Sequence, residues 1–325
     1  MTTTVNATIV EAVNDALHTE MAADDRVVVL GEDVAESGGV FRATDRLKEA
    51  FGSDRVVDTP LSEIAIVGGA VGLAVYGLRP VAEIQFSGFL PPAFDQLVTH
   101  ASRMRWRTRG AWTAPLVVRT PYGAGVRALE HHGESLEGAY AHIPGLKVVI
   151  PSTPSDTKGL LLSAIRDPDP VLFMEPKHVY RSFREEVPGE DYTVPIGEAA
   201  VRREGEDVTV IAWGSMMEQA SEAIDGLGVD AELIDLRTIS PMDTETVVES
   251  VKKTGRAVVV HEGHRSGGWG AELVASINDE ALMYLEAPIE RVTGYDVPVP
   301  LLSMEDYYLP NPVRIAAGIE DVLEY

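Results

Sequence analysis

The chain has 325 residues and no cysteine, and its 51 acidic residues outnumber its 27 basic residues, for a net charge of −24. Its length suggests roughly two domains with full hydrophobic cores. The absence of cysteine excludes disulfides, thiolate nucleophiles and thiolate metal sites. The charge excludes electrostatic binding to nucleic acid or anionic membranes, and the polar opening residues do not resemble a signal peptide, so we expect a cytoplasmic protein.

The acidic residues are spread along the chain, and only six residues are lysines. Acid that serves a basic partner would be concentrated in one block or tail. An even distribution with few lysines is typical of adaptation to a salt-rich cytoplasm, because salt screens the repulsion between like charges. We therefore interpret the charge as a halophilic feature.

Helical and strand patterns alternate through the first half of the chain. Apolar residues at helical spacing predict a first helix over 9–21. Short apolar runs predict strands at 26–30, 56–57, 81–86, 116–119, 147–150 and 171–174, with further helices at 62–77, 92–105, 136–142 and 156–165. This alternation is typical of an α/β fold with a parallel sheet.

After Glu175 the pattern lapses into residues rich in proline and charge, which is typical of a linker. A second α/β unit follows, with predicted strands at 208–213, 231–236, 257–260 and 289–292 and helices at 217–227, 244–253, 271–278 and 313–323. We therefore divide the chain into a first domain over 1–180, a linker over 181–199 and a second domain over 200–325.

The segment around Glu63 is the most informative in the chain. Pro60 prevents an earlier helix start, and Ser62 can cap a helix that begins at Glu63. Residues 64–77 are apolar, contain four glycines and have no polar face, so we expect this helix to be buried all round and approached closely by a neighbouring backbone or a cofactor. Glu63 then has two explanations, favourable charge at a helix start or proton chemistry in a dry pocket, and the residues alone leave both open.

A second informative segment, residues 120–145, leaves a strand and forms a glycine-bearing loop before a helix near Ser135. Loops at the carboxyl ends of parallel strands carry ligands in such folds. The adjacent His131 and His132 lack the spacing of a helical zinc pair, and His131 is best explained as a surface residue. No glycine-rich phosphate-binding motif is present, so either no phosphorylated cofactor binds or another chain supplies that half of the site.

Several segments resemble the beta subunit of the thiamine-diphosphate-dependent decarboxylase component of 2-oxoacid dehydrogenase complexes. They are TPLSE at 59–63, AEIQF at 82–86, PGLKVVIP at 144–151, KGLL at 158–161, SAIRD at 163–167, DLRTI at 235–239 and EAP at 286–288. The resemblance implies a transketolase-like fold, with a pyrimidine-binding domain and a C-terminal domain, in an alpha-two beta-two heterotetramer. It also implies that the alpha subunit carries the diphosphate and magnesium motif, while the beta subunit holds the aminopyrimidine.

The resemblance implies roles for three residues of this chain. Glu63 matches the carboxylate that bonds the pyrimidine nitrogen and so promotes loss of the thiazolium proton. Phe89 matches the aromatic position that packs on the pyrimidine. His132 matches the active-site histidine that acts during acyl transfer to the lipoyl group.

The resemblance also implies a structural potassium ion held by oxygen atoms of the beta subunit. The matching positions are Leu116, Ala164, Ile165, Asp167 and Asp169. Asp169 replaces an asparagine of some relatives, which keeps the site rich in oxygen and adds a charge.

These matches imply a 2-oxoacid dehydrogenase subunit that decarboxylates pyruvate or a branched-chain 2-oxoacid and acylates the lipoyl group of an acyltransferase partner. Another transketolase-like enzyme, acetoin-cleaving or ferredoxin-linked, is one alternative. A non-catalytic scaffold subunit is another, although the presence of Glu63, Phe89 and His132 together speaks against it. The sequence does not choose between the two classes of 2-oxoacid.

The net charge of −24 predicts that the thermal stability of the protein depends on salt. We expect the thermal unfolding midpoint to rise between low salt and molar potassium chloride, because the screening length falls from about 10 Å at 0.1 M to about 3 Å at 1 M. A series of unfolding curves at increasing salt measures this. A midpoint that stays flat or falls would contradict the halophilic interpretation.

Overall fold

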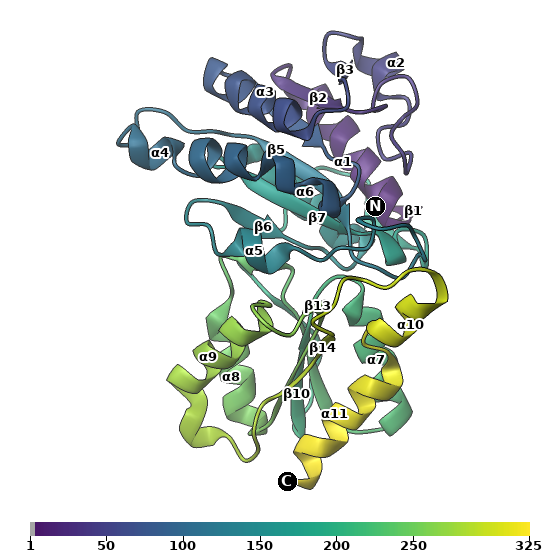
Figure 1. The fold of residues 1–325 in the computed structure, drawn as a ribbon, viewed down its shortest axis with the longest axis vertical. Coiled ribbons are helices and arrows are strands. Elements are labelled where there is room, and N and C mark those ends of the chain that lie inside the picture. Colours follow the sequence, from purple (N-terminus) through teal and green to yellow (C-terminus); the bar gives the residue numbers. More distant parts are fainter. Residues whose placement is uncertain (1–3) are drawn as a thin grey trace.

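The structure is a computed structural model that describes residues 4–325. Two α/β units lie end to end along the longest axis of the molecule (Figure 1). The first unit contains a seven-stranded sheet, the second a five-stranded sheet, and a third sheet has two strands. The α/β class with two largely parallel sheets, predicted from the sequence, is confirmed.

The seven-stranded sheet has the order β12-β6-β7-β5-β4-β2-β3. Its strands are β2 (Val27–Gly31), β3 (Val56–Asp58), β4 (Arg79–Glu83), β5 (Val117–Tyr122), β6 (Lys147–Val149), β7 (Val171–Pro176) and β12 (Thr238–Ser240). The helices of this unit are α1 (Ile9–Ala23), α2 (Leu47–Phe51), α3 (Glu63–Tyr76), α4 (Met104–Arg107), α5 (Glu137–Ala141) and α6 (Pro154–Arg166). Val117 and Val171 face a core with α1 and α6, whereas Val118 and Leu172 face a core with α3, so these strands are buried on both faces.

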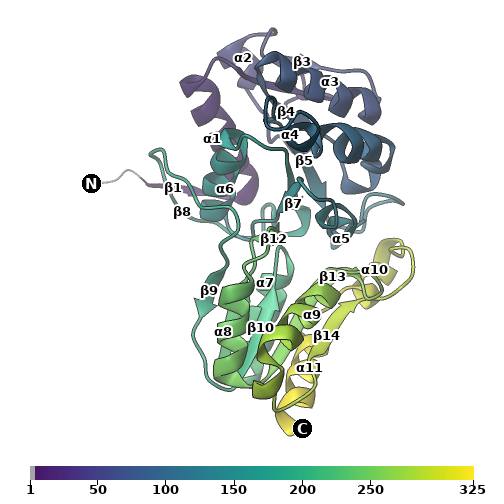
Figure 2. The same cartoon turned by 90° about the vertical axis from the view of Figure 1, so that its left-hand side faces the viewer.

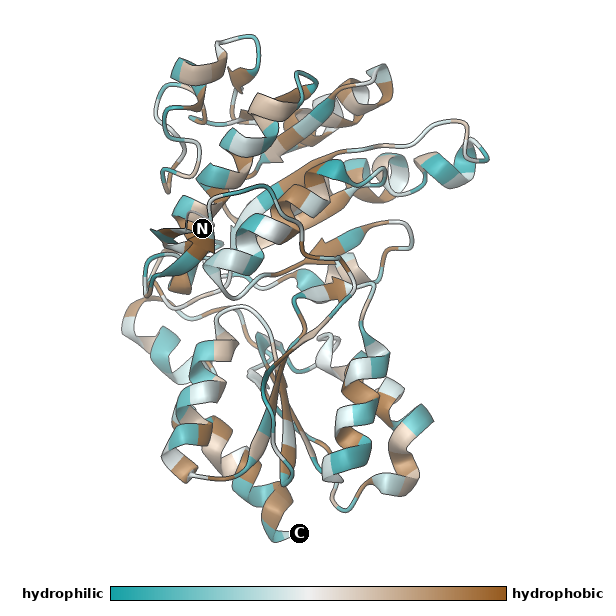
Figure 3. Ribbon diagram, turned by 180° about the vertical axis from the view of Figure 1, so that it is seen from behind, coloured by the Kyte–Doolittle hydropathy of each residue, from teal (hydrophilic) through white to brown (hydrophobic). Residues whose placement is uncertain are grey.

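The five-stranded sheet of the second unit has the order β14-β13-β10-β11-β9. Its strands are β9 (Ala200–Arg203), β10 (Val208–Ala212), β11 (Ala231–Asp235), β13 (Ala257–His264) and β14 (Glu290–Gly294). The helices are α7 (Met216–Leu227), α8 (Thr244–Thr254), α9 (Gly270–Ala281), α10 (Glu305–Tyr308) and α11 (Pro312–Glu324), with single turns η5 (Leu282–Tyr284) and η6 (Leu302–Met304). Strands coloured as hydrophobic lie between helices with hydrophilic outer sides in this unit (Figure 3).

Two predicted elements differ from the structure. The predicted helix over 92–105 is instead the turn η2 (Pro91–Ala93), the π-helix η3 (Gln96–Ala101) and α4, which follow the turn η1 (Ser87–Phe89). The π-helix ends where Ser102 donates its backbone N–H to the Leu97 carbonyl and its hydroxyl to the Val98 carbonyl at 2.8 Å. The predicted linker follows the turn η4 (Lys177–Val179) and contains β8 (Glu185–Pro188), which pairs with β1 (Thr4–Ala7) beside α1 and α6 (Figure 2).

The expectation that α3 is buried all round is wrong for this chain. One face is buried against the sheet through Ile66, Val67, Ala70, Val71 and Ala74, but the other face is exposed. Its exposed residues are apolar, with Ile64 at 48% and Tyr76 at 88% exposure. The Ser62 side chain also makes no capping hydrogen bond.

Within residues 4–325, no helix combines the length and apolarity that crossing a membrane requires.

The two units meet through the carboxyl edges of their sheets. The segment after β11 forms β12, which leaves the second unit and pairs antiparallel with β6 at the edge of the first sheet. At the end of β11, the Asp235 carboxylate accepts a hydrogen bond from the Ser152 hydroxyl, which follows β6. Beside it, Gly214 after β10 faces the Tyr122 hydroxyl at the end of β5. Segments that follow the strands of both sheets are therefore brought together at this junction.

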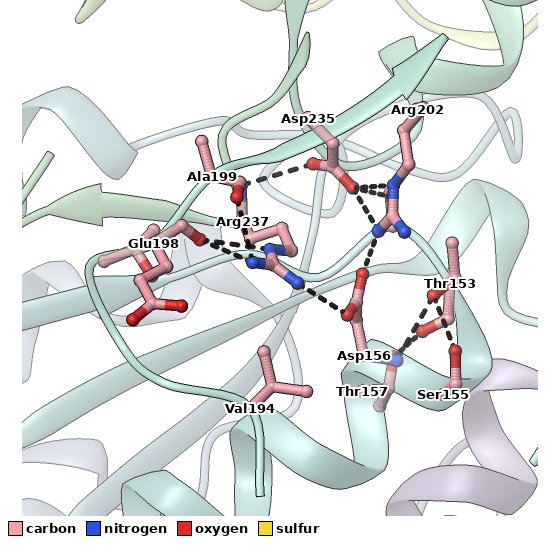
Figure 4. Close-up of polar contacts among 12 residues, drawn as sticks. Thr153, Ser155, Asp156, Thr157, Val194, Glu198, Ala199, Arg202, Asp235 and Arg237 are labelled. Carbon is pink, nitrogen blue, oxygen red and sulfur yellow. Dashed lines mark hydrogen bonds and ion pairs between the residues drawn. The ribbon is translucent and has the colours of Figure 1, made fainter. Parts of the chain in front are cut away.

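A buried ion-pair network fastens this junction (Figure 4). Asp156, in the first turn of α6, pairs with Arg202 of β9 and, at 3.0 Å, with Arg237. Arg202 also contacts Asp235 at 2.9 Å, and Arg237 donates to the carbonyl of Glu198. Burial raises the pKa of Asp235, while the Arg202 guanidinium opposes that rise. Ion pairs of low exposure with this many partners fix the second unit against the first.

Candidate active site

The residues with candidate functions gather at the carboxyl edge of the first sheet. Strands β3, β2, β4, β5 and β7 are neighbours and run parallel, so their carboxyl ends lie along one edge. The segments after these strands begin with Glu32 after β2, 59–63 after β3, 84–89 after β4, 123–134 after β5 and Lys177 after β7. Such an edge is where ligands bind in parallel α/β folds.

Phe86, Phe89 and His132 form one aromatic cluster at this edge. The His132 ring centroid lies 4.3 Å from that of Phe86 and 5.1 Å from that of Phe89. The turn η1 places Phe89 here, and Gly88 allows the close approach, because a Cβ at Gly88 would collide with the His131 carbonyl. Two of the three residues singled out by the resemblance, Phe89 and His132, are thus in contact.

The two adjacent histidines have different surroundings. The Nδ1 atom of His132 lies 2.8 Å from the Glu130 carbonyl, which can only accept, so Nδ1 carries the hydrogen. In the neutral ring, Nε2 of His132 is then free to accept a proton. His131 has a positive φ of 66° and an exposed side chain. Its placement agrees with the interpretation of His131 as a surface residue.

Glu63 lies at the same edge, on the first residue of α3, and is half-buried. Within residues 4–325 its carboxylate makes no hydrogen bond or ion pair with protein, and the nearby Thr59 hydroxyl is buried without a partner. Burial, together with the charges of Glu63 and Asp33, raises the pKa of Glu32. No hydrogen bond or ion pair joins Glu63 to the aromatic cluster, so a ligand that used Glu63, Phe89 and His132 would have to bridge them.

A buried charge network lies beneath this edge and was not predicted. Arg119 of β5 donates to Glu175 of β7 at 2.7 and 2.8 Å and also bonds Glu83 of β4. Burial raises the pKa of Glu83, although the Arg119 guanidinium opposes the rise. Burial and the neighbouring Glu175 also raise the pKa of Tyr180. Charged residues inside three apolar strand patterns were the available signal in the sequence, because such residues are rarely buried unless they are paired.

A second unpredicted group lies where the two units meet. Glu137 on α5 is fully buried, with one carboxylate oxygen unpartnered, and burial raises its pKa to about 7. The Lys177 ammonium is also buried without a hydrogen-bond partner, and burial lowers its pKa to about 8. Neither group belongs to the cluster of Phe86, Phe89 and His132.

The positions matched to a potassium site lie close together, but their oxygens have protein partners. The Ile165 and Asp167 carbonyls accept hydrogen bonds from Arg79 at 2.7 and 3.2 Å. The Asp167 carboxylate pairs with Lys147, and Asp169 pairs with Arg105 at 2.8 Å. The Leu116 and Ala164 carbonyls accept backbone N–H groups. An ion here would compete with three cationic side chains, so the residues do not fit a ready-made potassium site and we derive no role for one.

Within residues 4–325, no group of three or more His, Cys, Asp or Glu side chains is arranged to hold a metal ion. Of the three residues singled out in the sequence, the structure brings Phe89 and His132 into contact and places Glu63 at the same edge of the sheet.

Comparison with known structures shows the fold. The chain superimposes with a TM-score of 0.77 on a protein titled "Split gene transketolase, inactive beta4 tetramer", with 22% identity over 98% of this chain and 99% of that one. A transketolase from Leishmania mexicana gives a TM-score of 0.72 with 17% identity, and the match covers all of this chain and 47% of that one.

Comparison of the sequence shows the family. Residues 6–182 match the model "Transketolase, pyrimidine binding domain", and residues 197–315 match "Transketolase, C-terminal domain". The chain is 54% identical over 315 residues to the pyruvate dehydrogenase E1 component subunit beta of Acholeplasma laidlawii, covering 96% of both chains. It is 50% identical to the same subunit of Bacillus subtilis, covering 98% of this chain and 99% of that one. The resemblance found in the sequence is confirmed: the chain belongs to the family of pyruvate dehydrogenase E1 component beta subunits, with transketolase pyrimidine-binding and C-terminal domains.

Proposed function

We propose that this chain forms half of the active site of a pyruvate dehydrogenase, together with an alpha subunit and thiamine diphosphate. The reaction would be the oxidative decarboxylation of pyruvate, with transfer of the acyl group to the lipoyl group of an acyltransferase. The observation that carries the proposal is the carboxyl edge of the first sheet, where Glu63, whose carboxylate has no protein partner, and the cluster of Phe86, Phe89 and His132 follow parallel strands of the same sheet. The names of the relatives favour pyruvate.

The residues at this edge fit the aminopyrimidine of thiamine diphosphate. Glu63 has a free carboxylate, the Thr59 hydroxyl is buried without a partner, and Phe89 offers a half-buried ring to a flat heterocycle. When bound, the cofactor would supply a nucleophilic thiazolium carbon and an acceptor for the negative charge that decarboxylation creates.

The side chains of this chain would act by holding protons and excluding water. The Glu63 carboxylate would hold a proton on the pyrimidine nitrogen, an interaction that strengthens when the site is dry. Phe86 and Phe89 would keep water from that site. His132 directs Nδ1 toward the Glu130 carbonyl, so in the neutral ring its Nε2 could accept a proton from the substrate or the lipoyl group and return it later.

The exposed face of α3 supports the assignment of an alpha subunit as partner. Ile64, Val75 and Tyr76 are exposed apolar residues, and Gly69 and Gly72 face open space. An apolar helix face of this kind marks an interaction surface. We propose that the alpha subunit covers it and brings the magnesium and the diphosphate site next to Glu63, which would bury the helix as the sequence predicts.

Other functions remain testable alternatives. A branched-chain 2-oxoacid would use the same machinery with a different acyl pocket, and an acetoin-cleaving or ferredoxin-linked enzyme would use another acceptor. A scaffold subunit would not need Glu63, Phe89 and His132 to be retained together. We also propose that the charge of −24 adapts the assembly to high salt.

The proposed sharing of the cofactor site between the alpha subunit and this chain can be tested. The purified chain alone is expected to bind thiamine diphosphate weakly and to release no carbon dioxide from pyruvate, because it has no phosphate-binding glycine motif. Adding an alpha chain should restore tight binding and turnover. Calorimetric titration and carbon dioxide release measure the two quantities, and tight binding with turnover by the chain alone would overturn the proposal.

Glu63→Gln tests the role of the carboxylate. The substitution keeps the size and a hydrogen-bonding group but removes the charge, so we expect proton exchange at the thiazolium carbon to slow by about 10²–10⁴-fold. NMR of the reconstituted tetramer measures this exchange before any substrate is added. Glu49→Gln, on an exposed side chain of α2, is the control. If Glu63→Gln exchanges at the parental rate, Glu63 only stabilises the start of its helix.

His132→Ala is expected to act at a later step. Cofactor binding and thiazolium proton exchange should stay near parental values, while acylation of an isolated lipoyl domain falls by about 10²-fold or more. His131→Ala is the matched control, because the His131 side chain is exposed and lies outside the aromatic cluster. A larger loss in His131→Ala than in His132→Ala would show that the wrong histidine had been assigned.

A further inference from the structure

We propose that two carboxylates of the second unit, Glu262 and Glu305, position the loop that carries His132. The loop is residues 123–134, which connect β5 to the segment before α5. The proposal rests on the proposed function, because it assigns positioning residues to that same site. By this proposal the C-terminal domain helps to place His132, although no residue of that domain belongs to the aromatic cluster.

Glu262 of β13 binds the beginning of the loop. One of its carboxylate oxygens accepts the backbone N–H of Ala124 at 2.7 Å, and the other accepts the Ser215 hydroxyl at 2.6 Å. The carboxylate also lies against Gly123, where a Cβ would come within 2.6 Å of both oxygens. Glycine is therefore required at 123 for this contact to form.

Glu305, the first residue of α10, binds the next part of the loop. Its two oxygens accept the backbone N–H groups of Gly125 at 2.7 Å and of Arg127 at 2.5 Å. Both carboxylates are 2% exposed. Backbone N–H groups that converge in this way form an anion-binding concavity, and hydrogen bonds to a buried charge are among the stronger ones in proteins.

The loop has a backbone that needs such support. The φ angles of Gly123 and Gly125 are 84° and 92°, and the non-glycine residues Arg127 and His131 have φ of 52° and 66°. Left-handed conformations of non-glycine residues persist only where the surrounding structure holds them. Since Arg127 and His131 flank the segment that leads to His132, loss of the carboxylates would let the histidine move away from Phe86 and Phe89.

The other contacts described between the loop and the second unit are weaker, or they do not involve the backbone of the loop. Arg127 pairs with Asp306 at 2.7 Å, but both side chains are more than half exposed, and such pairs contribute little. The buried Lys177 ammonium is attracted by both Glu262 and Glu305, but it donates no hydrogen bond to the loop. The exposed Asp306 therefore offers a control next to Glu305 on the same helix.

The test uses the reconstituted tetramer with Glu305→Gln, Glu305→Ala and Asp306→Asn. Two rates are measured: decarboxylation with an artificial electron acceptor, and acylation of a lipoyl domain. We expect Glu305→Ala to lower lipoyl acylation by about 10²-fold, as a misplacement of about 1 Å can do, with Glu305→Gln intermediate and decarboxylation changed less than threefold. Asp306→Asn should match the parent. In Glu305→Ala, the further change His132→Ala should cost nothing more, because both act through one histidine.

Limited trypsin digestion gives a readout without activity. Cleavage after Arg127 should be faster in Glu305→Gln than in Asp306→Asn, because the loop is no longer held. If Glu305→Ala fails to assemble, Glu262→Gln replaces it with the same expectations. Equal losses in both rates, additive losses with His132→Ala, or unchanged cleavage would overturn the positioning role. A parental tetramer that does not decarboxylate any 2-oxoacid would instead overturn the proposed function.

Discussion

The structure depends on the meeting of two parallel sheets at their carboxyl edges. A parallel sheet places the ends of all its strands along one edge, and here the second unit turns its edge toward that of the first. Strand β12 crosses from one unit to the other, and Asp156 with Arg202 and Arg237 fastens the crossing. Because the loops that follow strands carry function in such folds, this one constraint brings the loops of both units to a single region.

That arrangement explains how the site is divided. In the proposed site, the first unit would supply Glu63, Phe89 and His132 from segments that follow three different strands, while two carboxylates of the second unit bind the histidine loop. The buried network around Arg119 lies beneath the same edge and joins β4, β5 and β7. What the chain lacks is a phosphate-binding motif, and the exposed apolar face of α3 is the surface where a partner with that motif would be placed.

Much of this could be predicted from the sequence, for physical reasons that differ between elements. Alternating apolar runs and helical spacing identified most strands and helices, because burial on both sides of a parallel sheet leaves a strong pattern. The short strands β1, β8, β9 and β12 were missed because a three- or four-residue strand leaves almost no pattern and is fixed by its distant partner. The prediction of one helix over 92–105 was wrong because apolar spacing does not distinguish a π-helix from an α-helix.

The candidate site likewise contains residues that the sequence predicted and contacts that it did not. Glu63, Phe89 and His132 were selected through the resemblance, and the structure added the contact between Phe89 and His132. Spacing along the chain could not show that Glu262 and Glu305 bind the loop backbone, because they lie 138 and 180 residues after Ala124 and Gly125, the residues that they contact. Nor could it show that α3 has an exposed apolar face, since a uniformly apolar helix looks the same whether its own chain or a partner covers it.

The most direct measurement isolates the native complex that contains this chain and compares carbon dioxide release from pyruvate and from branched-chain 2-oxoacids. We predict that an alpha chain and an acyltransferase accompany this chain, and that pyruvate is decarboxylated at a kcat/KM about tenfold or more above that for the branched-chain acids. A complex that releases carbon dioxide from neither class, or a chain that is isolated without an alpha partner, would contradict the account.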